Sequence, residues 1–512
     1  MTHHFLSRAV IVLVACALAA SARATVRMVD NTSDAGAGSL RAAITAAVSG
    51  DAIRFAIPET GVQTISPATP LPPIAAGVTI DGTTQSGASC ATWPPTLLVE
   101  IAGDATTPAG SDGLSINGND VLVRGLVINT FSGDAIQLND ASGVRIECNF
   151  LGTDATGALD YGDLGVGVRL IGSTLAVVGG QAVSQRNLIS ANAVAGVLVD
   201  AASSGNSVQG NYIGTDASGA ARLDNFNGVI VRGANNDVTG NLISGNVESG
   251  VLFDVATATG NLVLGNAIGP NATDTAALAN GAAGVYLLNG ASQNTIGTPG
   301  GGNRFRANGA NGVWVDGATS IRNSIRGNSM TGNGAIGIAL GPVFAATPND
   351  PGDPDSGPNR IQNTPVLVDV AYAAGLNQVT AIFAVSTDPS NATYPLLVDF
   401  YAVDVDVEEG EFYLGTLSYD ANDFAAGNVT KSFTALGLLQ AGNDVVATAT
   451  DADGNTSEFT PGAITVGVPE PAALVSGFAA LAALAAFRQR NDTTMRKSQR
   501  SDGRAPISID AT

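Results

Sequence analysis

The chain has 512 residues, including 63 glycines, and its 44 acidic and 23 basic residues leave a net charge of −21. Such an acidic chain repels nucleic acid and anionic lipid headgroups, so neither is an expected partner. The two histidines are His3 and His4 at the extreme N-terminus. A mature chain without them has no imidazole for Ser-His-Asp, Cys-His or His-zinc chemistry.

Residues 1–24 have the pattern of a secretory signal peptide. Arg8 precedes an apolar run, and Ala22 and Ala24 form a small-x-small cleavage site. We therefore expect an exported chain that a signal peptidase has trimmed. An alternative is lipid attachment at Cys16, because the four residues that end there resemble a lipobox.

Removal of the signal peptide leaves two cysteines, Cys90 and Cys148. In an oxidising compartment two cysteines favour a disulfide, and two separately buried thiols are the alternative.

Residues 25–57 are expected to cap the end of a solenoid, because an exposed apolar cross-section needs an amphipathic cover. Ser39 can cap a helix that ends at Gly50, with Leu40, Ile44 and Val48 on one face. The segment resembles the N-terminal region of bacterial β-helix proteins of the CSLREA type.

A short apolar phrase recurs through residues 58–345 at intervals of about 22 to 34 residues, which is the signature of a solenoid. Each phrase is brief, rich in Val and Ile, and bounded by Gly, Asn, Asp or Ser, which favours strands and turns over helices. The phrases begin at Ala135, Gly167, Gly196, Gly228, Gly250, Gly284, Gly312 and Gly337.

Asparagines recur at fixed places in these phrases. Asn tolerates left-handed turns, and its amide can bond to the same amide on the next coil. The two series are Asn187, Asn241, Asn303 and Asn328, and Asn192, Asn246, Asn308 and Asn333. With its N-x-I-G-T-D and N-x-I-S-x-N phrases, this region resembles a right-handed parallel β-helix of the pectin-lyase-like class.

Residues 346–359 form a break rich in Asp, Pro and Gly. Asp350, Asp353 and Asp355 could bind a structural Ca²⁺ there, and a solvated acidic linker is the alternative. Alternating strands over 360–467 predict an antiparallel β-sandwich similar to immunoglobulin-like modules.

The last segment begins with Val468, Pro469, Glu470 and Pro471, and continues through an apolar stretch and arginines to residue 490. It resembles the PEP-CTERM sorting signal, which implies a membrane helix, cleavage by an exosortase-like enzyme, and delivery to the cell surface or matrix. Residues 491–512 form a basic tail that is expected inside the cell. Because such signals normally end sooner, retention as a membrane anchor stays open.

Alternation along each strand predicts an outward row that contains Tyr286 and Trp314, which could contact a glycan. The alternative is that loops cover this row. In the next outward row, Asp200, Arg232 and Asp254 alternate in sign, which favours a structural charge ladder.

A glycosidase needs two carboxylates at a fixed separation. Asp254 and Asp316 with Arg232 are the weak catalytic candidates, and no polygalacturonase-like motif accompanies them. Asp154 and Asp216 are best explained as capped turns.

The sequence therefore predicts an all-β chain: an N-terminal helical cap, a right-handed parallel β-helix, an immunoglobulin-like sandwich and a C-terminal membrane helix. The favoured function is a surface or matrix protein whose rigid rod binds or organises envelope or extracellular polysaccharide. One alternative is a polysaccharide lyase or hydrolase, and another is a receptor or assembly part for a second surface protein.

Overall fold

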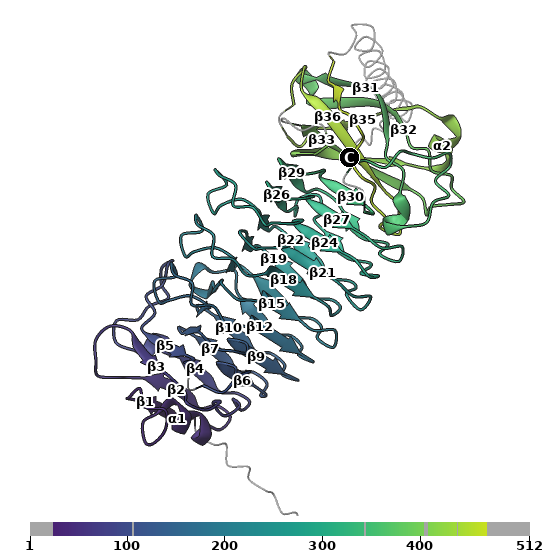
Figure 1. Ribbon diagram of the computed structural model, residues 1–512. Helices are drawn as coiled ribbons and strands as arrows, with labels where there is room; N and C mark the ends of the chain where they lie inside the picture. The colour runs from purple at the N-terminus through teal and green to yellow at the C-terminus, as the bar shows by residue number, and fades with distance from the viewer. Residues whose placement is uncertain (1–23, 105–106, 343–344, 404–407, 438, 468–512) are drawn as a thin grey trace, which may run out of the picture. The chain divides into compact units, whose positions relative to one another are not determined.

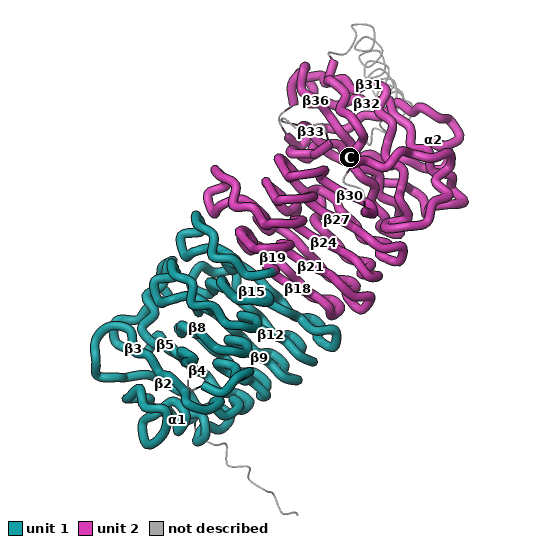
Figure 2. The backbone as a smooth tube through the Cα atoms, in the orientation of Figure 1, with its two compact units in different colours: residues 1–226 teal, residues 227–512 magenta. Residues whose placement is uncertain are grey.

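The computed structural model describes residues 24–104, 107–342, 345–403, 408–437 and 439–467. The chain divides into two compact units, residues 1–226 and residues 227–512 (Figure 2). The boundary therefore falls inside the repeats and not at the 346–359 segment. Almost all of the expected signal peptide, and the whole segment from Val468 onward, lie outside the described residues.

Unit 1 begins with the expected helix, although it is shorter than predicted. Helix α1 (Leu40–Ala46) is capped by Ser39, whose side chain accepts from the backbone N–H of Ala42, and it buries Leu40 and Ile44. It ends at Ala46 because the next residue is extended, so Val48 is half-exposed instead of lying on the apolar face.

The strands of unit 1 stack in three parallel sheets (Figure 1). One contains β1 (Val26–Val29), β2 (Ala52–Phe55), β4 (Thr79–Asp81), β7 (Leu122–Arg124), β10 (Arg145–Glu147), β13 (Val177–Gly179) and β16 (Ser207–Gln209). The second contains β3 (Gln63–Ile65), β5 (Val99–Ala102), β8 (Val127–Asn129), β11 (Phe150–Leu151), β14 (Leu188–Ile189) and β17 (Tyr212–Ile213). The third contains β6 (Leu114–Ile116), β9 (Ile136–Asn139), β12 (Val166–Ile171) and β15 (Ala195–Val199).

The residues expected to act as a cap already belong to this stack. β1 pairs with β2, and β2 pairs in parallel with β4, so the first coils lie inside the 25–57 segment. The reason is that Ile53 and Phe55 alternate inward and are buried as fully as later strand residues.

Unit 2 continues the same architecture in its first part. One sheet contains β19 (Asp237–Thr239), β22 (Leu262–Leu264), β25 (Thr295–Ile296) and β28 (Ser324–Ile325). The second contains β20 (Leu242–Ile243), β23 (Ala267–Ile268), β26 (Arg304–Arg306) and β29 (Ser329–Thr331). The third, here called sheet C, contains β18 (Asn227–Val231), β21 (Val251–Phe253), β24 (Val285–Leu287), β27 (Val313–Val315) and β30 (Ile338–Leu340).

In both units the strands are short, parallel and in register, so the prediction of a parallel β-helix is confirmed. Val313 and Val315 are fully buried, while Trp314 between them is only half-buried, as strand alternation requires.

The predicted asparagine ladders are present. In unit 2 the backbone N–H and the side-chain amide of Asn266 both donate to Oδ1 of Asn303, at 3.0 and 2.9 Å. Asn303 in turn donates to Oδ1 of Asn328. Asn266 and Asn303 thus each donate toward the following coil, and the same Oδ1 acceptor also satisfies a buried backbone N–H at the corner.

The second predicted series, and one that the sequence analysis missed, form ladders of the same kind in unit 2. The second series runs through Asn246, Asn280, Asn308 and Asn333. The missed ladder runs through Asn236, Asn261, Asn294, Asn323 and Asn359.

Two antiparallel sheets follow the repeats within unit 2, as the sequence predicts. One contains β31 (Val366–Ala373), β32 (Gln378–Ala384) and β35 (Val429–Thr434). The other contains β34 (Phe412–Tyr419), β33 (Leu396–Val403), β36 (Asp444–Thr450) and β37 (Ile464–Thr465). The short helix α2 (Ala421–Ala426) links β34 to β35, and residues from both sheets, including Phe383 and Phe400, share one core. Over the described ranges, neither α1 nor α2 nor any other helix is long and apolar enough to cross a membrane.

The antiparallel region also closes the last coil of the repeats. Glu409, which is buried, accepts from both the backbone N–H and the side-chain amide of Asn333. The Phe459 ring lies against Gly337, where an added Cβ would approach a ring carbon to 2.7 Å. The ladder through Asn333 therefore ends on a side chain of the antiparallel region.

The Asn303→Ala variant should lower the free energy of unfolding by about 2 kcal/mol or more, because it leaves the buried backbone N–H of Asn266 without an acceptor and removes one bond of the Asn266 amide. Denaturant unfolding of the purified chain measures this. Asn428→Ala, at an exposed position, is the matched control and should change stability by less than about 0.5 kcal/mol. Equal stability of the two variants would contradict the role given to the ladder.

Candidate functional site

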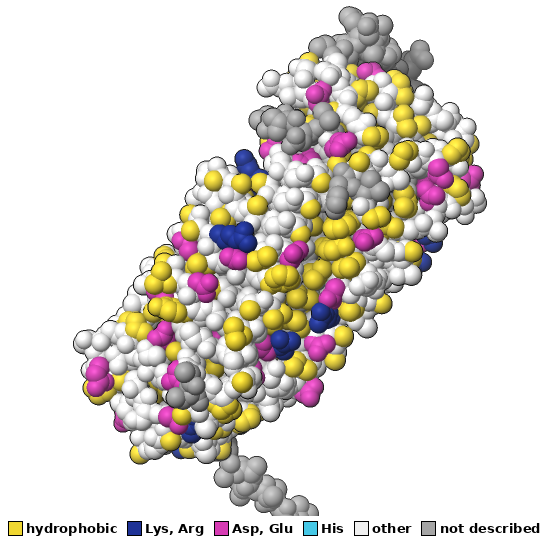
Figure 3. All heavy atoms as spheres, in the orientation of Figure 1, with side chains coloured by type: hydrophobic (Ala, Val, Ile, Leu, Met, Phe, Trp, Pro, Cys, Tyr) yellow, Lys and Arg dark blue, Asp and Glu magenta, His cyan; other side chains and the backbone are white. Residues whose placement is uncertain are grey.

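The outward side chains of sheet C in unit 2 form the row that the sequence analysis identified. Leu252 pairs in register with Tyr286, Tyr286 with Trp314, and Trp314 with Ala339. Ile230 precedes Leu252 in the same row. Figure 3 shows hydrophobic side chains gathered along the face that carries β21, β24 and β27 in Figure 1.

The two aromatic residues of this row are stacked on each other. Their ring centroids lie 4.2 Å apart with 8° between the planes. Nε1 of Trp314 donates to the carbonyl of Gly341 at 2.7 Å, which fixes the indole. Because the stack covers one face of each ring, a ligand can meet only the other face and the ring edges, and the edges carry partial positive charge that suits sugar oxygens.

The phenol of Tyr286 lies 3.5 Å from Oδ2 of Asp316. Burial, followed by the charge of Asp316, raises the pKa of Tyr286 to about 12. The phenol therefore stays protonated at neutral pH and remains a hydrogen-bond donor.

The rest of the row is covered to different extents. Leu198 in unit 1 and Ile230 in unit 2 are each 4% exposed, whereas Leu252, Tyr286 and Trp314 are half-buried. Leu198 and Ile230 are therefore covered, as the alternative interpretation expects. Leu252, Tyr286 and Trp314 keep surface that a ligand can reach.

The candidate catalytic residues lie at the edge of the same sheet and are engaged with neighbours. Arg232 forms a bidentate ion pair with Asp254, with Nε–Oδ1 and Nη2–Oδ2 distances of 2.8 and 2.7 Å. Asp316 accepts from the N–H of Gly317 at 2.7 Å. The Arg232–Asp254 pair is what the charge-ladder interpretation expects.

A general acid needs a carboxyl that keeps its proton, and burial raises the pKa of several carboxyls in the described part of the chain. None of them belongs to this row; they are Asp112, Asp163, Asp237, Asp353 and Glu458.

Asp163 in unit 1 is a buried group that the sequence analysis missed. Its Oδ1 accepts from the N–H of Phe131 at 2.7 Å, while Oδ2 has no partner. Burial, followed by the charges of Asp134 and Asp112, raises its pKa well above the usual range. Asp160, three residues earlier, is exposed, and no local sequence pattern marks Asp163 as the buried one. The burial of Asp163 is therefore visible only in the folded structure.

Asp154 and Asp216 form capped turns, as the sequence indicates. Oδ1 of Asp154 accepts from the N–H groups of Ala158 and Leu159, both at 3.0 Å. Asp216 makes the equivalent bonds two coils later.

The acidic segment after the repeats contains a buried carboxyl at Asp353. Its Oδ2 accepts from Nε2 of Gln362 at 2.7 Å, from the N–H of Asn363 at 3.1 Å and from the hydroxyl of Thr387 at 2.7 Å. Burial is the main reason that its pKa rises to about 6.

The neighbours Asp350 and Asp355 add to this rise in the pKa of Asp353. Oδ1 of Asp350 and Oδ1 of Asp353 are buried without partners. Across the described residues, no three His, Cys, Asp or Glu side chains gather as a metal site would require. Calcium bound by Asp350, Asp353 and Asp355 stays a prediction.

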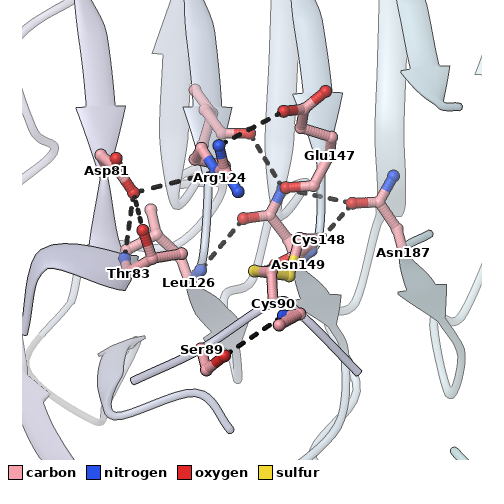
Figure 4. The surroundings of a disulfide bond; sticks show 12 residues. Asp81, Thr83, Ser89, Cys90, Arg124, Leu126, Glu147, Cys148, Asn149 and Asn187 are labelled. Atoms are coloured by element: carbon pink, nitrogen blue, oxygen red, sulfur yellow. Dashed lines mark hydrogen bonds and ion pairs between the residues drawn. A yellow bond between two sulfur atoms is a disulfide. The ribbon is translucent and has the colours of Figure 1, made fainter. Parts of the chain in front are cut away.

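Cys90 and Cys148 are joined in a disulfide (Figure 4). It ties the loop that contains Cys90 to the turn between β10 and β11. The indole of Trp93, in the same loop, donates to the carbonyl of Ala217 at 2.8 Å, and the guanidinium of Arg186 lies 5.1 Å from its ring. The bond and these contacts give the loop a structural role.

Comparison with known proteins finds no matching family model and no matching curated protein. Similar solved structures include ORF18 of Geobacillus virus E2, with 11% identity over 85% of this chain and 86% of that one, and a TM-score of 0.36. An alginate lyase from Paenibacillus sp. is 16% identical over 62% of this chain and 97% of its own, with a TM-score of 0.29.

The A-module of the mannuronan C-5 epimerase AlgE4 from Azotobacter vinelandii is 15% identical over 60% of this chain and 88% of its own, with a TM-score of 0.32. At TM-scores this low the likeness carries no argument, so the fold rests on the strand pairing described above.

The Asp353→Asn variant should flatten the dependence of stability on pH. Because the folded-state pKa is raised from 3.8 to about 6, the folded chain binds more protons than the unfolded chain in this window. Its contribution to stability is therefore present below about pH 4 and is lost as the pH rises through 6. Melting temperatures from pH 4 to 7 in EDTA measure the slope.

Asp388→Asn is the matched control. Its pKa is lowered by hydrogen bonds from Ser390, so this variant should shift all melting temperatures in that range together and keep the wild-type slope. A wild-type slope in Asp353→Asn would contradict the assignment.

Proposed function

We propose that this chain is an exported surface or matrix protein that binds polysaccharide along the row Leu252, Tyr286 and Trp314. The observation that supports it is the aromatic stack, half-buried on a parallel sheet and held by the Trp314–Gly341 hydrogen bond. Strands in such a sheet repeat about every 4.8 Å, so the three side chains offer a rigid contact line of about 9.6 Å for part of an extended polymer.

The surroundings of the row suit a polar polymer with apolar patches. The phenol of Tyr286 is a protonated donor, and the Arg232–Asp254 pair and Asp316 supply charged groups at the margin. An apolar patch with a polar margin is typical of a binding surface. Because the net charge of the chain is −21, a neutral polysaccharide is favoured over an acidic one.

The proposal includes the finer sequence assignments. They are export through the signal peptide, sorting or membrane anchoring through Val468 to Pro471 and the segment after them, and an immunoglobulin-like identity for the antiparallel region. The proposal also includes a structural calcium ion bound by Asp350, Asp353 and Asp355.

Hydrolysis or lyase action on a polysaccharide is the second candidate function. The observation that favours it is that Asp254 and Asp316 are two rungs apart, or about 9.6 Å at ~4.8 Å per rung. This spacing lies just above the range of inverting glycosidases, whose two carboxyls are about 6.5–9.5 Å apart. A release assay for reducing sugars and unsaturated uronates separates this function from binding alone.

The Tyr286→Ala/Trp314→Ala variant should bind polysaccharide about tenfold more weakly, because it removes the stack and roughly 1.4 kcal/mol of contact. Electrophoresis through gels that contain neutral or acidic polysaccharides measures the retention. Phe412→Ala, which removes an exposed aromatic ring from β34, is the matched control and should behave as wild type. Equal retention of all three proteins on every polysaccharide would refute the proposal.

A further inference from the structure

A polar groove of about 390 Å³ opens in unit 2 beside β25 and β28. This volume is at the lower end of the ~300–1,000 Å³ range of small-molecule sites. Side chains of the repeats line one part of the groove, and a turn of the antiparallel region lines the other. The residues that matter below are Gln293, Thr295, Arg322, Ser324, Asp453 and Gly454.

Arg322 has an unusual backbone for its residue type. Its φ is 61°, in the left-handed region, where Gly260 and Gln293 stand in the two preceding coils. For a residue other than glycine this conformation costs about 1–2 kcal/mol. The N–H of Arg322 is held by Oδ1 of Asn455 at 2.7 Å, so the antiparallel region helps to fix the residue at the groove.

The guanidinium of Arg322 keeps unused hydrogen-bonding capacity. Its Nε is buried and has no partner, and its Nη2 lies 3.7 Å from Oδ2 of Asp453. That distance is too long for a hydrogen bond. The Arg322 guanidinium and the Asp453 carboxylate thus line the same groove as a loose ion pair with no hydrogen bond between them.

Two adjacent hydroxyls of a sugar match this pair, since one accepts from a guanidinium and the other donates to a carboxylate. A carboxylated sugar fits less well, because its charge would meet Asp453 as well as the net negative charge of the chain.

We propose that this groove binds one neutral hexose unit, with the exposed end of the Arg322 guanidinium donating to one hydroxyl and Asp453 accepting from the next. Gln293, Thr295 and Ser324 supply further polar groups around the ring. The inference rests on the proposed function, since it takes a sugar as the ligand class, and it adds a second binding position away from the aromatic row.

Calorimetric titration of the purified full chain with D-glucose, D-galactose, D-mannose and D-glucuronate tests the proposal. At least one neutral hexose should bind with a Kd of the order of 1 mM, and D-glucuronate at least about tenfold more weakly. Arg322→Asn, which tolerates the left-handed backbone, and Asp453→Asn should each weaken hexose binding at least about tenfold without lowering the melting temperature.

Arg304→Asn is the matched control, because Arg304 is an exposed arginine of β26 that pairs with Asp274 away from the groove. It should bind hexose as wild type does. The proposal is overturned if no neutral hexose binds the wild-type chain, if Arg322→Asn binds hexose unchanged, or if D-glucuronate binds as tightly as the best hexose.

The outcome is separable from that of the proposed function. Tyr286→Ala/Trp314→Ala should keep hexose binding while it loses retention on polysaccharide gels. If the wild-type chain is not retained on any gel but hexose binds and depends on Arg322, the aromatic row is refuted and the groove is supported.

Discussion

The asparagine amide that bonds to the next coil is the contact on which the repeats depend. Short strands leave their corner backbone groups buried, and a buried N–H without a partner costs about 1–3 kcal/mol. In unit 2, Oδ1 of Asn303 accepts both donors of Asn266, and Asn303 itself donates onward to Asn328. The inward Val and Ile residues supply the apolar core, but it is the amides that make each coil fit its neighbour in one register.

This dependence explains how the repeats of unit 2 end. A last coil would carry amide donors with no acceptor, and a carboxylate, which only accepts, is well suited to receive them. The Glu409 carboxylate accepts from both donors of Asn333, and Oδ1 of Asn359 accepts from the backbone N–H of Asn323. Arg326 and the buried Asp399 add a bidentate ion pair between the last coil and β33. The antiparallel region is therefore part of the folded repeat and not an independent appendage.

The rigidity that follows bears on both proposed binding positions. Tyr286 and Trp314 stack because their strands are neighbours in register, and the indole is held further by Gly341. Arg322 stands where Asn455 fixes its backbone. Neither position needs a moving loop to form, which lowers the entropic cost of holding a sugar.

The repeat period, the inward and outward faces and two of the ladders could be predicted from sequence, because each depends on neighbours one coil away. The ladder through Asn236 and Asn294 was missed although a signal was present, since N-x-V/I-x-G-N begins at Asn236, Asn261 and Asn323, five residues before an Asn of the ladder through Asn303 in each case. The groove could not be predicted, since Arg322 and Asp453 meet only through the closing of the last coil. The burial of Asp163 and the early end of α1 likewise depend on packing that no local pattern carries.

The direction of the amide ladders sets a rule for altering the length of the molecule. Since the bonds from one ladder side chain to the next, such as Asn266 to Asn303 and Asn303 to Asn328, run toward the coil that follows, the first and last members of a ladder differ in what they need. A chain that ends after Asn333 would leave the donors of Asn333 without Glu409 as acceptor. Deletion of one whole coil, from the residue after Asn266 to Asn303, would instead place Asn266 against Asn328, and the ladder would continue. The repeats of unit 2 can thus be shortened by deletion of an internal coil, while the first and last coils keep their present contacts.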